Sequence, residues 1–73
     1  MHNSINIYCH QDGTWTVINN RNKQFALIMK VKVTGFYDRG TATKYQVFHK
    51  GKIIASRVDY FQEAKGIANQ AVS

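Results

Sequence analysis

The sequence predicts an α+β fold: a small antiparallel β-meander of four to five strands, with one C-terminal α-helix packed on one face. Three observations predict it. Apolar and polar residues alternate in several segments before residue 57, which is typical of half-buried strands. Short turn sequences separate these segments. From residue 60 the apolar spacing becomes helical. Because no linker-like stretch divides the chain, residues 1–73 are expected to form a single domain.

The first two strands are expected at about residues 4–10 and 14–19. Asp12-Gly13 lies between them and predicts a hairpin turn. A two-residue loop there places Trp15 and Tyr8 on one face and, on the other, Ile5, Ile7, Cys9 and Ile18. Trp15 is expected in the core because its burial removes a large apolar area from water; the alternative is a ligand platform.

The third strand is expected at residues 25–34. Every odd position from Phe25 to Val33 is apolar, whereas Lys30 and Lys32 fall on the opposite side. This period of two predicts a strand that is buried on its odd side and exposes Lys30 and Lys32 on the other.

Two further strands are expected at about residues 43–49 and 52–56, joined by Lys50-Gly51 as a two-residue loop. This loop pairs Phe48 with Ile53 and Val47 with Ile54. One face then holds Tyr45, Val47 and Ile54, and the other holds Lys44, Gln46, Phe48, Ala55 and Arg57. The alternative is a register shifted by one residue, which exchanges the two faces.

The last element is expected to be an amphipathic helix over about residues 60–71. Asp59 is a suitable N-cap, and Gln62 three residues later completes a variant of the capping box. The apolar stripe consists of Phe61, Ala64, Ile67, Ala68 and Ala71. Because alanine predominates in it, the helix can lie close to the sheet.

The net charge of +6 is concentrated in the middle of the chain. Residues 21–57 contain nine basic residues and one acidic residue, Asp38, a balance of +8. Clustered cations raise the local potential and are typical of a surface that faces a polyanion. The alternative is that these cations keep a small domain soluble and protect its strand edges.

DNA or RNA is therefore the expected partner, bound through a basic sheet face by an accessory or regulatory factor of bacterial, phage or mobile-element origin. Cations neutralise phosphates, and an exposed aromatic ring stacks on an unpaired base or wedges into a groove. The candidate nucleic-acid-binding residues are Lys30, Lys32, Arg39, Lys44, Gln46, Phe48, Lys50, Lys52 and Arg57.

A second class of function is a protein-interaction module or inhibitor whose basic surface binds an acidic protein partner, or a homodimerising structural domain. The same positive field would steer a protein partner. Apolar residues on both sides of the segment 45–55 favour this alternative, because they could form an interface. The sequence is compatible with a monomer or a homodimer.

No enzymatic activity, cofactor or metal is expected. The candidate metal ligands His2, Cys9, His10 and His49 match no usual zinc spacing. The glycines punctuate turns and do not lead into a helix, so no phosphate-cradling loop is present. The single cysteine is compatible with a reducing cytoplasm, and no signal peptide or membrane-spanning run is visible. A cytoplasmic protein without membrane association is expected.

The run from Lys44 to Ala55, followed by Tyr60-Phe61-Gln62-Glu63-Ala64 and Ala68, resembles DNA-binding domains of the AP2 and phage-integrase arm-binding type. The resemblance covers residues 30–71, and those domains consist of a three-stranded sheet and a helix. It implies that the sheet enters the major groove of DNA through Lys30, Lys32, Lys44, Gln46 and Arg57. The family usually carries Arg on its strands where this chain has mostly Lys, and Lys reads base edges less well.

Overall fold

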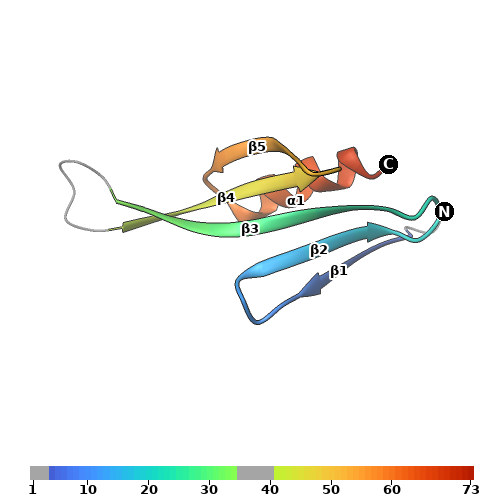
Figure 1. The fold of residues 1–73 in the computed structure, drawn as a ribbon, viewed down its shortest axis with the longest axis horizontal. Coiled ribbons are helices and arrows are strands. Elements are labelled where there is room, and N and C mark those ends of the chain that lie inside the picture. Colours follow the sequence, from blue (N-terminus) through green and yellow to red (C-terminus); the bar gives the residue numbers. More distant parts are fainter. Residues whose placement is uncertain (1–3, 35–40) are drawn as a thin grey trace.

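The computed structural model describes residues 4–34 and 41–73. Five antiparallel strands form one open sheet in the order β1-β2-β3-β4-β5, and one helix follows (Figure 1). The elements are β1 (Ile5–Cys9), β2 (Thr14–Asn19), β3 (Gln24–Thr34), β4 (Thr41–His49), β5 (Lys52–Val58) and α1 (Phe61–Ala71). The α+β meander with a C-terminal helix is therefore confirmed.

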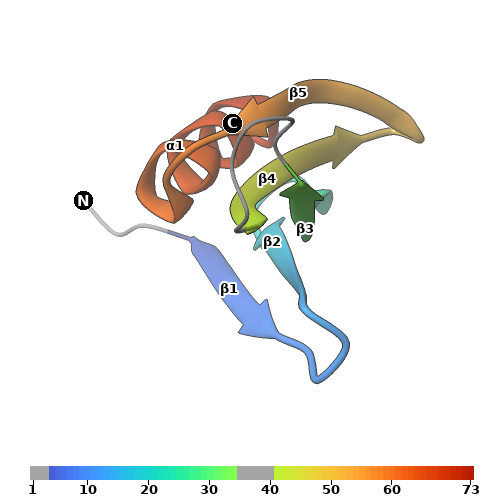
Figure 2. The same ribbon diagram turned by 90° about the vertical axis from the view of Figure 1, so that its left-hand side faces the viewer.

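Helix α1 packs on one face of the sheet, over β3, β4 and β5 and the nearer part of β2 (Figure 2). The helix contributes Ala64 and Ala68 to the contact, and both are fully buried. Because alanine has no side chain beyond Cβ, the helix backbone lies close to the sheet. The buried core comprises Val17, Ala26, Ile28, Val47, Val58, Ala64, Ala68 and Val72.

The helix covers the even side of β3, and the prediction that the odd side is buried is wrong. Ala26 and Ile28 are buried, whereas Phe25 is 54% exposed and Leu27 is 39% exposed. Both sides of this part of β3 are apolar, so alternation alone does not determine which side is covered. The small side chain of Ala26 suits the alanines of α1, and bulky Phe25 and Leu27 are left on the other face.

The β1–β2 hairpin has a three-residue loop, Gln11-Asp12-Gly13, and the predicted two-residue loop is wrong. The backbone N–H of His10 donates to the carbonyl of Thr14 at 2.9 Å. Gly13 adopts φ +85°, the left-handed conformation that closes such loops. The extra loop residue shifts the pairing, so that Cys9 pairs with Trp15 and Ile7 with Val17. Cys9 and Ile7 therefore share the face of Trp15, and Tyr8 lies on the opposite face.

Trp15 lies under the helix, against the core, as expected. Its ring is 4.8 Å from that of Phe61 and 6.0 Å from that of Tyr45, measured between centroids. Tilted pairs at these separations are favourable because the positive edge of one ring meets the negative face of the next. The three rings extend the core toward the start of α1.

The β4–β5 hairpin turns at Lys50-Gly51, with positive φ at both residues, and pairs Phe48 with Ile53 as predicted. Beyond that pair the register of β5 is irregular: Val47 pairs with Ala55 and Tyr45 with Val58. Bulges of this kind insert unpaired residues into one strand. Ala55 therefore packs against the core and Ile54 is exposed, the reverse of the prediction for these two residues.

The start of α1 differs from the prediction, and its other end is tied to the sheet. Tyr60, and not Asp59, is the N-cap residue, and no side chain caps the helix start. Asp59 pairs with Lys44 instead. At the other end the carbonyl of Val72 accepts from the side-chain amides of Asn19 and Asn22, each at 2.9 Å. These bonds join the end of the helix to the β2–β3 turn.

The assignment of the two faces of β3 can be tested with Ile28→Ala and Leu27→Ala. Ile28 is fully buried, so its truncation leaves a cavity and should lower the free energy of unfolding by about 2–5 kcal/mol. Leu27 is partly exposed, so Leu27→Ala should lower it by less than about 1 kcal/mol. Urea unfolding followed by circular dichroism measures both, and equal losses would contradict the assignment.

The anchor between the β2–β3 turn and α1 can be tested with Asn19→Ala. Asn19 is buried, and its amide both donates to Val72 and accepts from the N–H of Arg21. Its removal deletes both hydrogen bonds, each worth about 0.5–1.5 kcal/mol, and should therefore cost about 1–3 kcal/mol of unfolding free energy. Asn20→Ala, at an exposed neighbouring position, is the control and should change stability little.

Candidate nucleic-acid interface

In the part of the chain that the structure describes, no element covers the face of the sheet opposite α1 (Figure 2). We call this surface the open face. Cross-strand pairing places one row of side chains across all five strands of it, because paired residues share a face. The row consists of Tyr8, Thr16, Leu27, Phe48 and Ile53. The open face is therefore mainly apolar and not basic.

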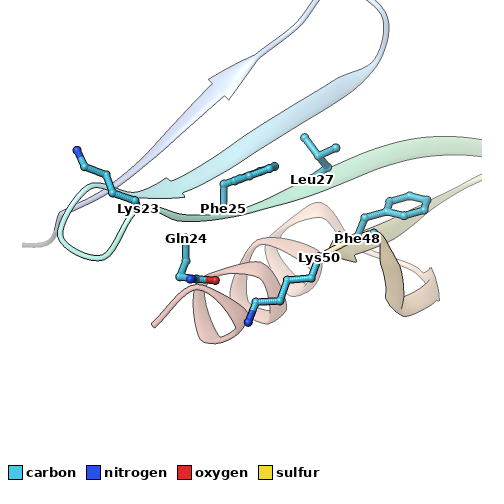
Figure 3. A pocket seen from close by; sticks show the side chains of 7 residues that line it. Lys23, Gln24, Phe25, Leu27, Phe48 and Lys50 are labelled. Atoms are coloured by element: carbon cyan, nitrogen blue, oxygen red, sulfur yellow. The ribbon is translucent and has the colours of Figure 1, made fainter.

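A hollow of about 360 Å³ lies at the end of the sheet where the β2–β3 and β4–β5 turns meet. We call it the turn-end hollow. Phe25 and Leu27 on β3 and Phe48 on β4 project from the open face beside it, whereas the side chain of Lys50 points toward the other side (Figure 3). The hollow thus wraps around the end of the sheet. Its lining residues are Lys23, Gln24, Phe25, Leu27, Phe48, Lys50 and Gly51.

The surroundings of the hollow are positively charged. Lys23 and Lys50 line it, and the exposed residues Arg21 and Lys52 lie in or beside the same two turns. The one ion pair among the described residues joins Lys44 to Asp59 at the opposite end of β4 and β5. The cations at the hollow are therefore available to an anionic ligand.

The described Asp and Glu side chains lie away from the hollow. Asp59 and Glu63 are at the start of α1, and Asp12 is in the β1–β2 turn, at the far end of β2. The hydroxyl of Thr14 donates to Asp12 and lowers the pKa of that carboxyl below its usual value. Asp12 thus stays ionised at its own end of the molecule.

The turn that carries Lys23 is held by hydrogen bonds that Asn19 and Asn22 accept. The N–H of Lys23 donates to the carbonyl of Asn19 at 2.8 Å, and the N–H of Gln24 donates to Oδ1 of Asn22 at 2.9 Å. Asn side chains commonly satisfy turn amides in this way. Since both Asn side chains also bind Val72, this turn is tied to the end of the helix.

The structure divides the predicted site residues, and the expectation that they form one basic sheet face is wrong. Lys44, Gln46 and Phe48 lie on the open face with Val31, Met29 and Leu27 as their partners. Lys30 and Lys32 lie on the helix side, because β3 is covered on its even side. The register of β3 therefore separates the two groups of lysines.

The remaining predicted residues lie around the edge of the sheet. Lys52 pairs with His49 and so lies on the helix side. Arg57 is exposed within the irregular part of β5, with φ +55°. Lys50 lines the turn-end hollow. Arg39 lies outside the described residues.

Lys23 and Phe25 line the hollow but were not predicted as site residues. The sequence signal for them is the second apolar pair on β3, Ala26 and Ile28. If the alanine stripe of the helix is matched to Ala26, Phe25 falls on the exposed side, next to a turn that ends in Lys23. The large apolar side chains at the odd positions of β3 instead predicted that the odd side is buried.

The chain matches no protein-family model, no curated protein and no solved structure. No helix among the described residues is long and apolar enough to cross a membrane. The described residues also contain no group of three or more side chains suited to hold a metal ion. Function is therefore inferred from the open face and the turn-end hollow.

Proposed function

We propose that the protein is a non-catalytic, cytoplasmic nucleic-acid-binding factor, and that the turn-end hollow with the adjoining open face is its binding site. The observation that carries the proposal is the combination of two Phe side chains and two Lys side chains around one hollow. Aromatic rings bind bases by stacking, and lysines neutralise phosphates. No described carboxylate forms an ion pair with these lysines.

The conformation of the two lysines supports the proposal. Lys23 and Lys50 have φ of +63° and +55°, in the left-handed region that glycine or asparagine adopts at lower cost. Lysine therefore makes the conformation of these turns less stable than glycine or asparagine would. Their charge beside the hollow is a physical reason for lysine to be there.

A second candidate is the homodimer or protein-interaction module, favoured by the apolar character of the open face. Its side chains Leu27, Met29 and Ile53 are between 39% and 55% exposed. Contiguous apolar surface of this kind marks interaction sites on small proteins. Sedimentation equilibrium distinguishes this candidate, because a face-to-face dimer would have twice the chain mass and would hide Phe25 and Phe48.

The proposal predicts binding that depends on salt and on the lysines of the hollow. Measured by fluorescence anisotropy with labelled DNA and RNA, affinity should fall linearly with log salt concentration, since bound phosphates release counterions. The variant Lys23→Glu/Lys50→Glu should weaken binding at least about tenfold and should make the salt dependence less steep by about one unit per lost phosphate contact.

The matched control is Lys30→Glu/Lys32→Glu, which makes the same change of net charge on the helix side of β3. It should weaken binding much less, and circular dichroism should show both variants folded. Equal effects of the two pairs would mean that net charge alone attracts the ligand. Absence of binding by the unmodified protein at low salt would refute the proposed function.

A further inference from the structure

We infer that the turn-end hollow binds single-stranded nucleic acid, with unpaired bases stacked on Phe25 and Phe48 and the backbone phosphates at Lys23 and Lys50. This inference rests on the proposed function and names the ligand class of the same site. The ligand chemistry is a planar base with a phosphate on either side, which single-stranded DNA and RNA share. Experiments with both distinguish the two sources.

Among residues 4–34 and 41–73, no other ring contacts Phe25 or Phe48. All three described ring contacts join Trp15, Tyr45 and Phe61 on the helix side of the sheet. Phe25 is 54% exposed, although an aromatic ring is normally placed where it buries area. Phe48 on the neighbouring strand is half-buried and lies on the same open face. Aromatic rings on neighbouring strands are the arrangement by which sheet surfaces stack consecutive bases.

The register gives each ring room for its own base. Leu27 pairs directly with Phe48, so Phe25, two residues before Leu27, is diagonal to Phe48. Diagonal neighbours on a sheet have Cα atoms about 7–8 Å apart, too far for the two rings to cover one another fully. Leu27 lies between them and supplies an apolar floor (Figure 3).

The distribution of charge favours a single strand over a duplex. On β1 to β4, the one described cation that the register places on the open face is Lys44, and it pairs with Asp59. A duplex presents its phosphates outward, so this apolar face would remove water from phosphates without replacing their partners. A single strand turns its bases onto the apolar face and leaves its phosphates at the rim, where Lys23 and Lys50 lie.

The test measures anisotropy of labelled single-stranded DNA, single-stranded RNA and the corresponding duplexes with the unmodified protein and with Phe25→Leu/Phe48→Leu. This variant keeps apolar side chains but removes both π faces. The single strands should bind at least about tenfold more tightly than the duplexes, and the variant should lose at least about tenfold in single-strand affinity. Its salt dependence should be unchanged, because the phosphate contacts remain.

Tyr60→Leu is the matched control, since Tyr60 is a 72% exposed aromatic residue at the start of α1, away from the open face. It should bind single strands as the unmodified protein does. A fluorescent base analogue within the strand reports stacking directly: its emission should be quenched by the unmodified protein and recover with the double Phe variant. Tighter binding of RNA than of DNA would assign the ligand to RNA, and the reverse to DNA.

Failure of the inference is distinguishable from failure of the proposed function. Equal or tighter binding of duplexes, or full affinity of the double Phe variant, overturns the inference; the proposed function then stands if Lys23→Glu/Lys50→Glu still weakens binding. No binding of any nucleic acid refutes both. A dimer that dissociates on substitution of Phe25 and Phe48 would assign the open face to self-association and also overturn the inference.

Discussion

The packing of Ala64 and Ala68 against Ala26 and Ile28 is the contact on which the rest of the structure depends. The three alanines let α1 approach β3 closely, and all four side chains are buried. Once the even side of β3 is covered, the period of two places every odd side chain on the open face. The candidate interface thus follows from the core: because Ala26 and Ile28 pack under the helix, Phe25, Leu27 and Met29 are left exposed on the other face.

The order and type of the elements could be predicted from the sequence, because alternation, turn residues and helical spacing are local properties. The choice of face could not, because it depends on contacts between elements. On β3 both sides are apolar, and only the fit to the alanines of α1 decides between them. At Gln11-Asp12-Gly13 the same residues are compatible with a loop of two or three residues, and the observed one places Tyr8 on the opposite face from Trp15. The irregular register of β5 was likewise not predictable, because no residue pattern within the strand indicates it.

The candidate site was predictable in composition but not in arrangement. The basic segment of residues 21–57 and its aromatic residue led to the prediction of Lys50 and Phe48 as site residues, and both border the hollow. Register then decides which cations act together, and it leaves Lys30 on the helix side and Lys44 on the open face. The basic set implied by the resemblance to sheet-type DNA-binding domains is thereby divided between two sides of one sheet. A DNA groove that contacts one face of the sheet would contact only part of this basic set. The turn-end hollow, in contrast, has cations and aromatic rings at one place.

Two unfavourable features of this small domain coincide at the turn end. Phe25 is exposed to water, and Lys23 and Lys50 adopt left-handed backbone conformations that cost a lysine more than a glycine. A chain of 73 residues has a thin core and a small net stability, so such features weigh heavily in it. They also lie on a rigid support, because Asn19 ties the turn to the end of α1. An exposed ring, and cations that form no ion pair among the described residues, are unfavourable for the free protein, and a ligand with flat bases and phosphates would stabilise them. Their coincidence at one hollow is the physical argument for function there.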